Sequence, residues 1–66
     1  MPHLNEATTR QTLDTLAAPQ AWTKQKETLY TNALRAMAIY YPAGDYPEHL
    51  LARVRAANNN RMRWEP

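Results

Sequence analysis

The 66-residue sequence contains no cysteine and no phenylalanine, and it has a single glycine. The absence of cysteine excludes disulfide bridges and thiolate metal sites, so neither can reinforce a small core. A single glycine excludes the glycine-rich loops that cradle phosphates and the Gly-Xaa-Ser-Xaa-Gly elbow of many hydrolases. A chain of this length buries only about 60% of the surface that its unfolded form exposes. We therefore expect marginal stability and a core that depends on tyrosine and tryptophan.

Long apolar runs are also missing. A membrane-spanning helix needs about 20 predominantly apolar residues, and no stretch of the chain approaches that length. The N-terminal sequence MPHLNEATTR lacks the charged-then-apolar order of a signal peptide. These features predict a cytoplasmic protein that has no membrane partner.

Residues that could bind a metal or perform catalysis are few. The two histidines, His3 and His49, lie far apart, and no acidic cluster accompanies either, whereas a metal site needs several convergent ligands. A chain this short rarely encloses a pocket of the size that small-molecule sites use. We therefore predict a protein that is not an enzyme, with no catalytic residues, no metal, no other cofactor and no small-molecule substrate.

Proline and glycine divide the chain into three stretches that are long enough for helices. The apolar residues in these stretches do not alternate with a period of two, and no hairpin signal occurs, so strands are not expected. The pattern predicts an all-α fold, a small three-helix bundle that forms a single domain over residues 1–66. Its helices are expected at about 5–17, 21–41 and 47–58, followed by a short arginine-rich tail over 59–66.

Each expected helix has a boundary signal. Asn5 is placed to accept hydrogen bonds from the free backbone amides at the start of the first helix. Pro42 ends the second helix because the residue before a proline is driven out of the helical region, and Pro47 suits the start of the third. The asparagines at 58–60 are the expected end of the third helix, since asparagine competes for backbone hydrogen bonds. The second helix carries the widest apolar face, with Trp22, Leu29, Ala33, Ala36 and Tyr40 in one stripe.

Charge is low overall but unevenly distributed. Eight Lys or Arg against six Asp or Glu give a net charge of +2, which is too small to indicate a nucleic-acid binder by itself. Residues 50–66, however, hold four arginines and a single acid, Glu65. If the chain unwinds at the asparagines, Arg61 and Arg63 lie in an extended tail with Trp64, where they can contact phosphates and stack on a base.

Two other uses fit the same segment. Arg53 and Arg55 can complement the negative end of the third helix while Trp64 folds back over the core. Arginine and tryptophan also dominate interface hot spots, so the segment can dock on an acidic protein surface. Tyr41 and Tyr46 flank the rigid turn before the third helix, and tyrosine is enriched at interfaces. The candidate partner-binding residues are therefore Tyr41, Tyr46, Arg53, Arg55, Arg61, Arg63 and Trp64.

One short motif resembles a known family. Residues 47–50 read PEHL and open a basic terminal helix, and the preceding helix begins just after a Leu-Ala-Ala stretch. Together these features resemble the theta subunit of bacterial DNA polymerase III, a small three-helix accessory protein that binds the proofreading subunit. The spacing differs by several residues and the tail after PEHL is shorter here, so no functional residue is carried over. The resemblance implies a small helical accessory protein in nucleic-acid metabolism.

The composition favours a non-enzymatic interaction protein. The chain is too small to enclose a pocket and has no cluster of metal ligands. Its surplus of aromatic and arginine residues favours binding through its surface. We expect it to bind and modulate a larger host or cognate protein, as an accessory or inhibitor of the phage or plasmid type. Self-association into a homodimer through the wide face of the second helix would complete a marginal core. The alternative is direct, low-specificity nucleic-acid binding through the basic C-terminal segment.

Overall fold

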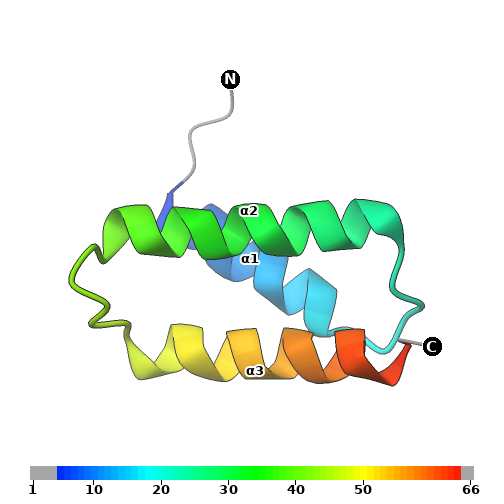
Figure 1. Ribbon diagram of the computed structural model, residues 1–66. Coiled ribbons are helices and arrows are strands. Elements are labelled where there is room, and N and C mark those ends of the chain that lie inside the picture. The colour runs from blue at the N-terminus through cyan, green and yellow to red at the C-terminus, as the bar shows by residue number, and fades with distance from the viewer. Residues whose placement is uncertain (1–4, 65–66) are drawn as a thin grey trace.

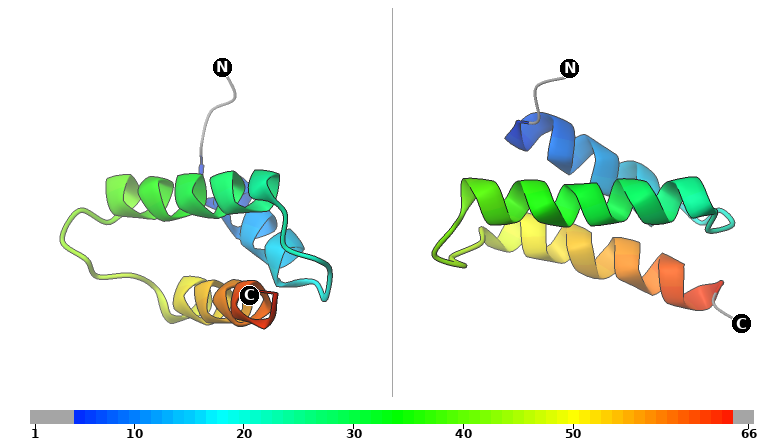
Figure 2. Two further views of the ribbon diagram at one scale, coloured as in Figure 1. Left: turned by 45° about the vertical axis from the view of Figure 1, so that its right-hand side comes forward. Right: turned by 45° about the horizontal axis from the view of Figure 1, so that its top comes forward.

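Three helices form the part of the chain that the computed structural model describes, residues 5–64. They are α1 (Glu6–Ala17), α2 (Lys24–Tyr40) and α3 (Glu48–Arg63). α2 and α3 run antiparallel along the length of the molecule, and α1 is inclined to both and packs against each of them (Figure 1 and Figure 2). No strand occurs within residues 5–64, so the predicted all-α three-helix fold is confirmed.

Local side-chain chemistry sets both ends of α1. Asn5 Oδ1 accepts a hydrogen bond from the Thr8 amide at 2.7 Å, which confirms the predicted cap. The helix ends at Ala17 because Pro19 disfavours the helical conformation at Ala18, which adopts φ −61° and ψ 143° instead.

α2 begins later than the sequence predicted. Its N-cap is Thr23, whose Oγ1 accepts the Lys26 amide at 3.2 Å. The helix therefore starts at Lys24 and not at residue 21, since a threonine in the extended conformation satisfies a free amide and stops the helix from extending backwards. Trp22 consequently lies in the connector and not in the apolar stripe of α2.

The connector between α2 and α3 is the tight turn that its prolines and glycine predict. Tyr41 leaves the helical region with φ −129° and ψ 67°, immediately before Pro42. The Gly44 amide donates to the Tyr41 carbonyl at 2.9 Å and closes the turn. Gly44 has φ 78°, a left-handed conformation that glycine adopts without steric cost. Pro47 then caps α3 with φ −59°, the value that its ring imposes.

α3 continues through the three asparagines to Arg63, so the predicted helix end at residue 58 is wrong and most of the predicted tail is helical. Asn60 is 3% exposed, and its Nδ2 donates to the carbonyl oxygens of Leu16 at 3.0 Å and of Gln20 at 3.2 Å. The last carbonyls of a helix have no partner within it, so Asn60 supplies a donor at the end of α1. This tertiary contact outweighs the weak helix propensity of asparagine.

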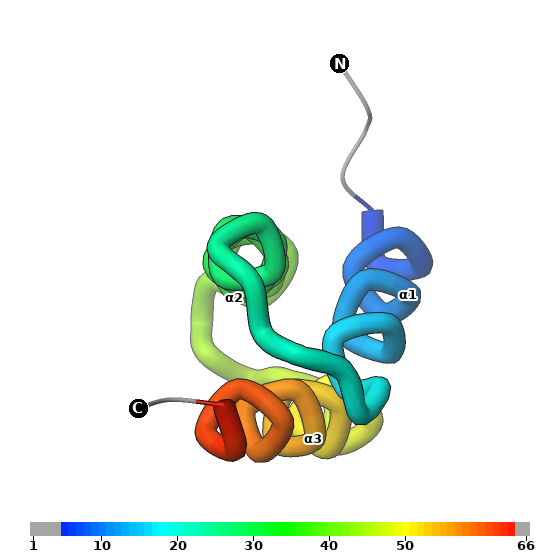
Figure 3. Tube along the Cα trace, turned by 90° about the vertical axis from the view of Figure 1, so that its right-hand side faces the viewer, coloured from blue at the N-terminus to red at the C-terminus, as the bar shows by residue number. Residues whose placement is uncertain are grey.

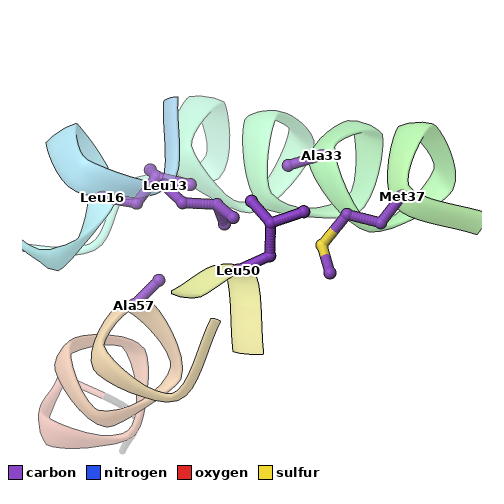
Figure 4. Close-up of a cluster of buried hydrophobic side chains, with 6 residues drawn as sticks. All are labelled: Leu13, Leu16, Ala33, Met37, Leu50 and Ala57. Carbon is purple, nitrogen blue, oxygen red and sulfur yellow. The ribbon is translucent and has the colours of Figure 1, made fainter. Parts of the chain in front are cut away.

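The core lies where the three helices converge (Figure 4). Three fully buried leucines are its largest members. The residues that pack together are Leu13, Leu16, Ala33, Met37, Leu50 and Ala57, and Ala36 is also buried. Burial of one leucine is worth about 1.5–3 kcal/mol, so this core is thin, as the chain length predicted. Half-buried residues form its rim: Trp22, Tyr30, Tyr41, Tyr46 and Val54.

The buried face of α2 is narrower than the sequence predicted. Ala33, Ala36 and Met37 are buried. Leu29, which the apolar stripe placed in the core, is 40% exposed, and Leu34 beside it is 38% exposed. The reason is that α2 packs mainly on α1, whereas α3 makes much less extensive contact with it, so only part of its wide apolar face is covered.

Candidate partner-binding surface

The seven residues predicted to bind a partner do not form one site. They occupy three places: the connector between α2 and α3, the first half of α3, and the last turn of α3. The first and last turns of this 16-residue helix lie about 20 Å apart, at a rise of about 1.5 Å per residue. The three groups are Tyr41 with Tyr46, Arg53 with Arg55, and Arg61 with Arg63 and Trp64.

Tyr41 and Tyr46 pack on each other edge to face, with ring centroids 6.0 Å apart. Both are half-buried against the core, and the Tyr41 hydroxyl donates to Glu6 Oε2 at 3.0 Å. Burial, and then this hydrogen bond, raise the pKa of Tyr41 above its ordinary value of 10.0. The pair thus joins the connector to the start of α1, and a role of these tyrosines in partner binding stays a prediction.

Arg53 and Arg55 are both engaged with carboxylates. Arg53 Nε lies 2.9 Å from Asp14 Oδ1 and links α3 to α1. Arg55 Nη2 lies 2.8 Å from Glu48 Oε1 within α3. Residues two apart on a helix point about 200° apart, so these two arginines lie on different sides of α3 and cannot grip one ligand together.

Glu27 is the centre of a polar cluster that the sequence did not reveal. Its Oε1 accepts hydrogen bonds from Trp22 Nε1 at 2.9 Å and from Arg61 Nε at 2.7 Å. The ring of Trp22 meets Tyr30 edge to face, with centroids 5.7 Å apart. The hydrogen bond from Arg61, followed by that from Trp22, lowers the pKa of Glu27 below its ordinary value of 4.5. The only local signal was an acid in the first turn of a helix, and Arg61 is 34 positions away.

The last turn of α3 carries the exposed part of the predicted segment. Met62 is 55% exposed and Trp64 is 50% exposed, so Trp64 does not fold back over the core. Arg63 is exposed, and its side chain has no ion pair or hydrogen bond with another residue of the described range. Glu65, the single acid of the basic segment, lies outside the described residues.

The start of α2 lies at the same end of the molecule as this last turn of α3, as the end-on view shows (Figure 3). Lys24 is exposed there. Among residues 5–64, Lys26 Nζ donates to two neutral oxygens, Gln20 Oε1 at 3.3 Å and the Ala21 carbonyl at 2.8 Å. Sequence reasoning did not connect these lysines with the tail, because only the fold brings the start of α2 beside the end of α3.

Metal binding and membrane insertion receive no support from residues 5–64. Within that range, no group of three or more His, Cys, Asp or Glu is placed to hold a metal ion. None of the described helices is long and apolar enough to cross a membrane.

Comparisons with known proteins found no relative of this chain. No family model matches it, and no curated protein and no solved structure matches it either. The resemblance of residues 47–50 to the theta subunit therefore has no support beyond the residues that suggested it.

Proposed function

We propose that this chain is a non-enzymatic interaction protein that binds a larger protein and modulates it by covering part of its surface. The observation that carries the proposal is the distribution of large apolar side chains. Within residues 5–64, the core buries four of them: Leu13, Leu16, Met37 and Leu50. The surface exposes five: Leu29, Leu34, Ile39, Met62 and Trp64. Single exposed apolar residues are ordinary, but residues 5–64 expose more large apolar side chains than they bury, and such a surface is one that a partner can cover.

Two of these side chains lie on a helix end that is held in place. Asn60 joins α3 to the end of α1, and Arg61 joins it to α2. Met62 and Trp64 follow directly, so they are ordered before a partner arrives and less conformational entropy is lost on binding. Methionine, arginine and tryptophan are also enriched at interfaces. An accessory or inhibitory role in the cytoplasm is part of the proposal.

Direct nucleic-acid binding has less support. It depended on an extended tail that carries Arg61 and Arg63, and both residues lie in α3. Within each pair, Arg53 with Arg55 and Arg61 with Arg63, the side chains point about 200° apart on the helix. Four arginines arranged in this way do not follow a single phosphate track.

An affinity capture with a nuclease control tests the proposal. The tagged chain is incubated with a cell lysate of which one half has been treated with nuclease, and bound proteins are identified by mass spectrometry. We expect a stoichiometric protein in both halves, retained as the salt concentration rises, because apolar contacts are little screened by salt. Loss of every specific partner after nuclease treatment would support nucleic-acid binding instead, and the absence of any specific partner contradicts the proposal.

A further inference from the structure

The last turns of α3, residues 58–63, bury no apolar side chain. The last buried apolar residue of the helix is Ala57. Beyond it the helix has one apolar side chain, Met62, which is 55% exposed, and Trp64 directly after the helix is 50% exposed. Helices in proteins are stable mainly because they pack an apolar face on their neighbours. The end of α3 lacks that support, and its three consecutive asparagines lower the intrinsic helicity further.

Two side chains attach these turns to the rest of the molecule by hydrogen bonds. Asn60 Nδ2 donates to the carbonyl oxygens of Leu16 at 3.0 Å and of Gln20 at 3.2 Å. Arg61 Nε lies 2.7 Å from Glu27 Oε1, and Arg61 Nη2 lies 3.3 Å from Glu27 Oε2. We call Glu27, Asn60 and Arg61 the latch. Each such contact replaces a contact with water, so its net contribution to stability is modest, and separation of these turns costs less than unfolding of the whole chain.

The first half of α3 is attached by apolar packing as well. Leu50 is fully buried, and Val54 packs against the core. Arg53 also pairs with Asp14 of α1 at 2.9 Å. All of these contacts lie before residue 58, so they remain when only the last turns leave. α3 thus has a packed part and a part held by polar contacts, a division typical of segments that open locally while the rest stays folded.

We propose that residues 58–63 detach from the fold as a unit, and that the latch thereby controls whether Met62 and Trp64 are presented to a partner. In the docked state, which is the state of the structure, the helix holds both side chains in place. In the detached state the segment loses its helical order, and ordering it again on binding costs conformational entropy. This inference rests on the proposed function, because it concerns the regulation of two of the side chains that would contact the partner.

The latch also holds the connector between α1 and α2 (Figure 1). Glu27 Oε1 accepts a hydrogen bond from Trp22 Nε1 at 2.9 Å as well as the one from Arg61. Gln20, whose carbonyl accepts from Asn60, also accepts from a lysine, Lys26 Nζ, through its side-chain oxygen at 3.3 Å. Detachment of the last turns removes one donor from Glu27 and one from Gln20. The connector should therefore loosen together with the end of α3, and the Trp22 indole N–H reports this change.

Amide hydrogen exchange, measured by nuclear magnetic resonance on the full chain, tests detachment in the absence of any partner. After correction for intrinsic rates, we expect the amides of residues 59–63 to share one protection factor, about tenfold below that of residues 54–57. Low concentrations of urea should change it little, because local opening exposes little surface. Equal protection of the two ranges overturns the inference. Protection that declines gradually towards Arg63 also overturns it, since that pattern is fraying and not detachment of a unit.

Matched variants test the latch. Glu27→Gln removes its charge and should raise exchange at residues 59–63 about threefold. Asp14→Asn makes the same chemical change in a pair that persists in the detached state, so it should leave residues 59–63 unchanged and affect only amides that need global unfolding, such as that of Leu50. Asn59→Ala replaces an exposed weak helix former and should slow exchange about threefold. Equal acceleration of residues 59–63 by Glu27→Gln and Asp14→Asn overturns the inference.

The partner found by affinity capture tests the regulatory part. Glu27→Gln combined with Asn60→Ala removes both attachments, and protection of the Leu50 amide shows that the core remains folded. The affinity of this variant for the captured partner should fall in proportion to the docked fraction. Unchanged affinity in a variant whose segment is mostly detached overturns the inference and leaves the proposed function intact. Failure of the unmodified chain to capture any partner contradicts the proposed function, whatever the exchange experiment shows.

Discussion

At the scale of single residues, Asn60 shows how one side chain changes the length of a helix. Asparagine usually disfavours helices because its amide competes for backbone hydrogen bonds. Here the Asn60 amide is occupied by the carbonyls of Leu16 and Gln20, so it no longer competes with the backbone of α3. Its Oδ1 is buried and has no partner among the described residues. The Asn60 side chain therefore acts here as a hydrogen-bond donor and not as an acceptor.

Replacement of Asn60 by alanine should destabilise the fold. Asn60→Ala removes the hydrogen bonds to the Leu16 carbonyl in α1 and to the Gln20 carbonyl in the connector, and leaves the buried Leu16 carbonyl without this partner, which costs about 1–3 kcal/mol. Asn60→Asp should be worse still, because a carboxylate would face carbonyl oxygens. Urea unfolding followed by circular dichroism measures the change, with the exposed Asn59→Ala as control. Equal stability of the Asn60→Ala and Asn59→Ala variants would contradict the assigned role.

Two adjacent tyrosines should respond in opposite ways to loss of the hydroxyl. The Tyr40 hydroxyl is buried without a partner in the described part of the chain, whereas that of Tyr41 donates to Glu6. Tyr40→Phe should therefore raise the free energy of unfolding, by up to about 1 kcal/mol, and Tyr41→Phe should lower it. Thermal unfolding of the two variants side by side measures the difference. A lower melting temperature for Tyr40→Phe than for Tyr41→Phe would show that the assignment is reversed.

At the scale of elements, the three helices are joined by carboxylates as well as by apolar contacts. Glu6 lies 3.4 Å from His49 and joins α1 to the first turn of α3. Asp14 joins α1 to the middle of α3, and Glu27 joins α2 to its end. Exposed ion pairs contribute little one at a time, and α3 takes part in all three of these contacts.

The contact between α2 and α3 should weaken in acid. The pKa of Glu27 in the folded chain lies below its ordinary value of 4.5. The ionised form is thus favoured by folding, and its contribution is fully present above pH 4.5 and is lost as the pH falls through the lowered pKa. Glu27→Gln should lower stability at neutral pH and flatten its decline in acid, as measured by urea unfolding over a pH series. Asp45→Asn, which changes an acid without an ion pair in the described range, is the control and should leave the slope unchanged.

At the scale of the whole molecule, stability depends on very few buried side chains. Leu13, Leu16 and Leu50 are the largest that are fully buried. A domain of this size has little free energy to spare. The exposed apolar side chains, in contrast, lie outside this core.

Substitution of a buried leucine should therefore lower the stability of the fold much more than substitution of an exposed isoleucine. Leu50→Ala should cost about 2–5 kcal/mol, enough to unfold much of the population. Ile39→Gln, at a side chain that is 71% exposed, should change stability by no more than about 0.5 kcal/mol. Far-ultraviolet circular dichroism of both variants at room temperature is sufficient to tell them apart. A helical Leu50→Ala variant of unchanged stability would mean that the core lies elsewhere.

Much of the fold followed from local chemistry, and the candidate site did not. Asn5, Pro42 and Gly44 act on backbone within a few residues of themselves, so their effects on α1 and on the turn were predictable. The start of α2 was missed because the Thr23 cap competed with an apolar pattern that continued through Trp22. The polar cluster around Glu27 was missed because Arg61 lies 34 positions away in the sequence, and only packing of the helices brings the two side chains together.

The sequence by itself determined that the chain is helical, where its prolines break it, and that its core is small, because these depend on local backbone preferences and on the number of apolar residues. The tertiary structure alone decided how far α3 extends and which arginines pair with carboxylates. Asn60 reaches a carbonyl 44 positions away, and Arg61 reaches a carboxylate 34 positions away. Such contacts form only when packing brings the helices together, and no local sequence pattern specifies which side chains will pair.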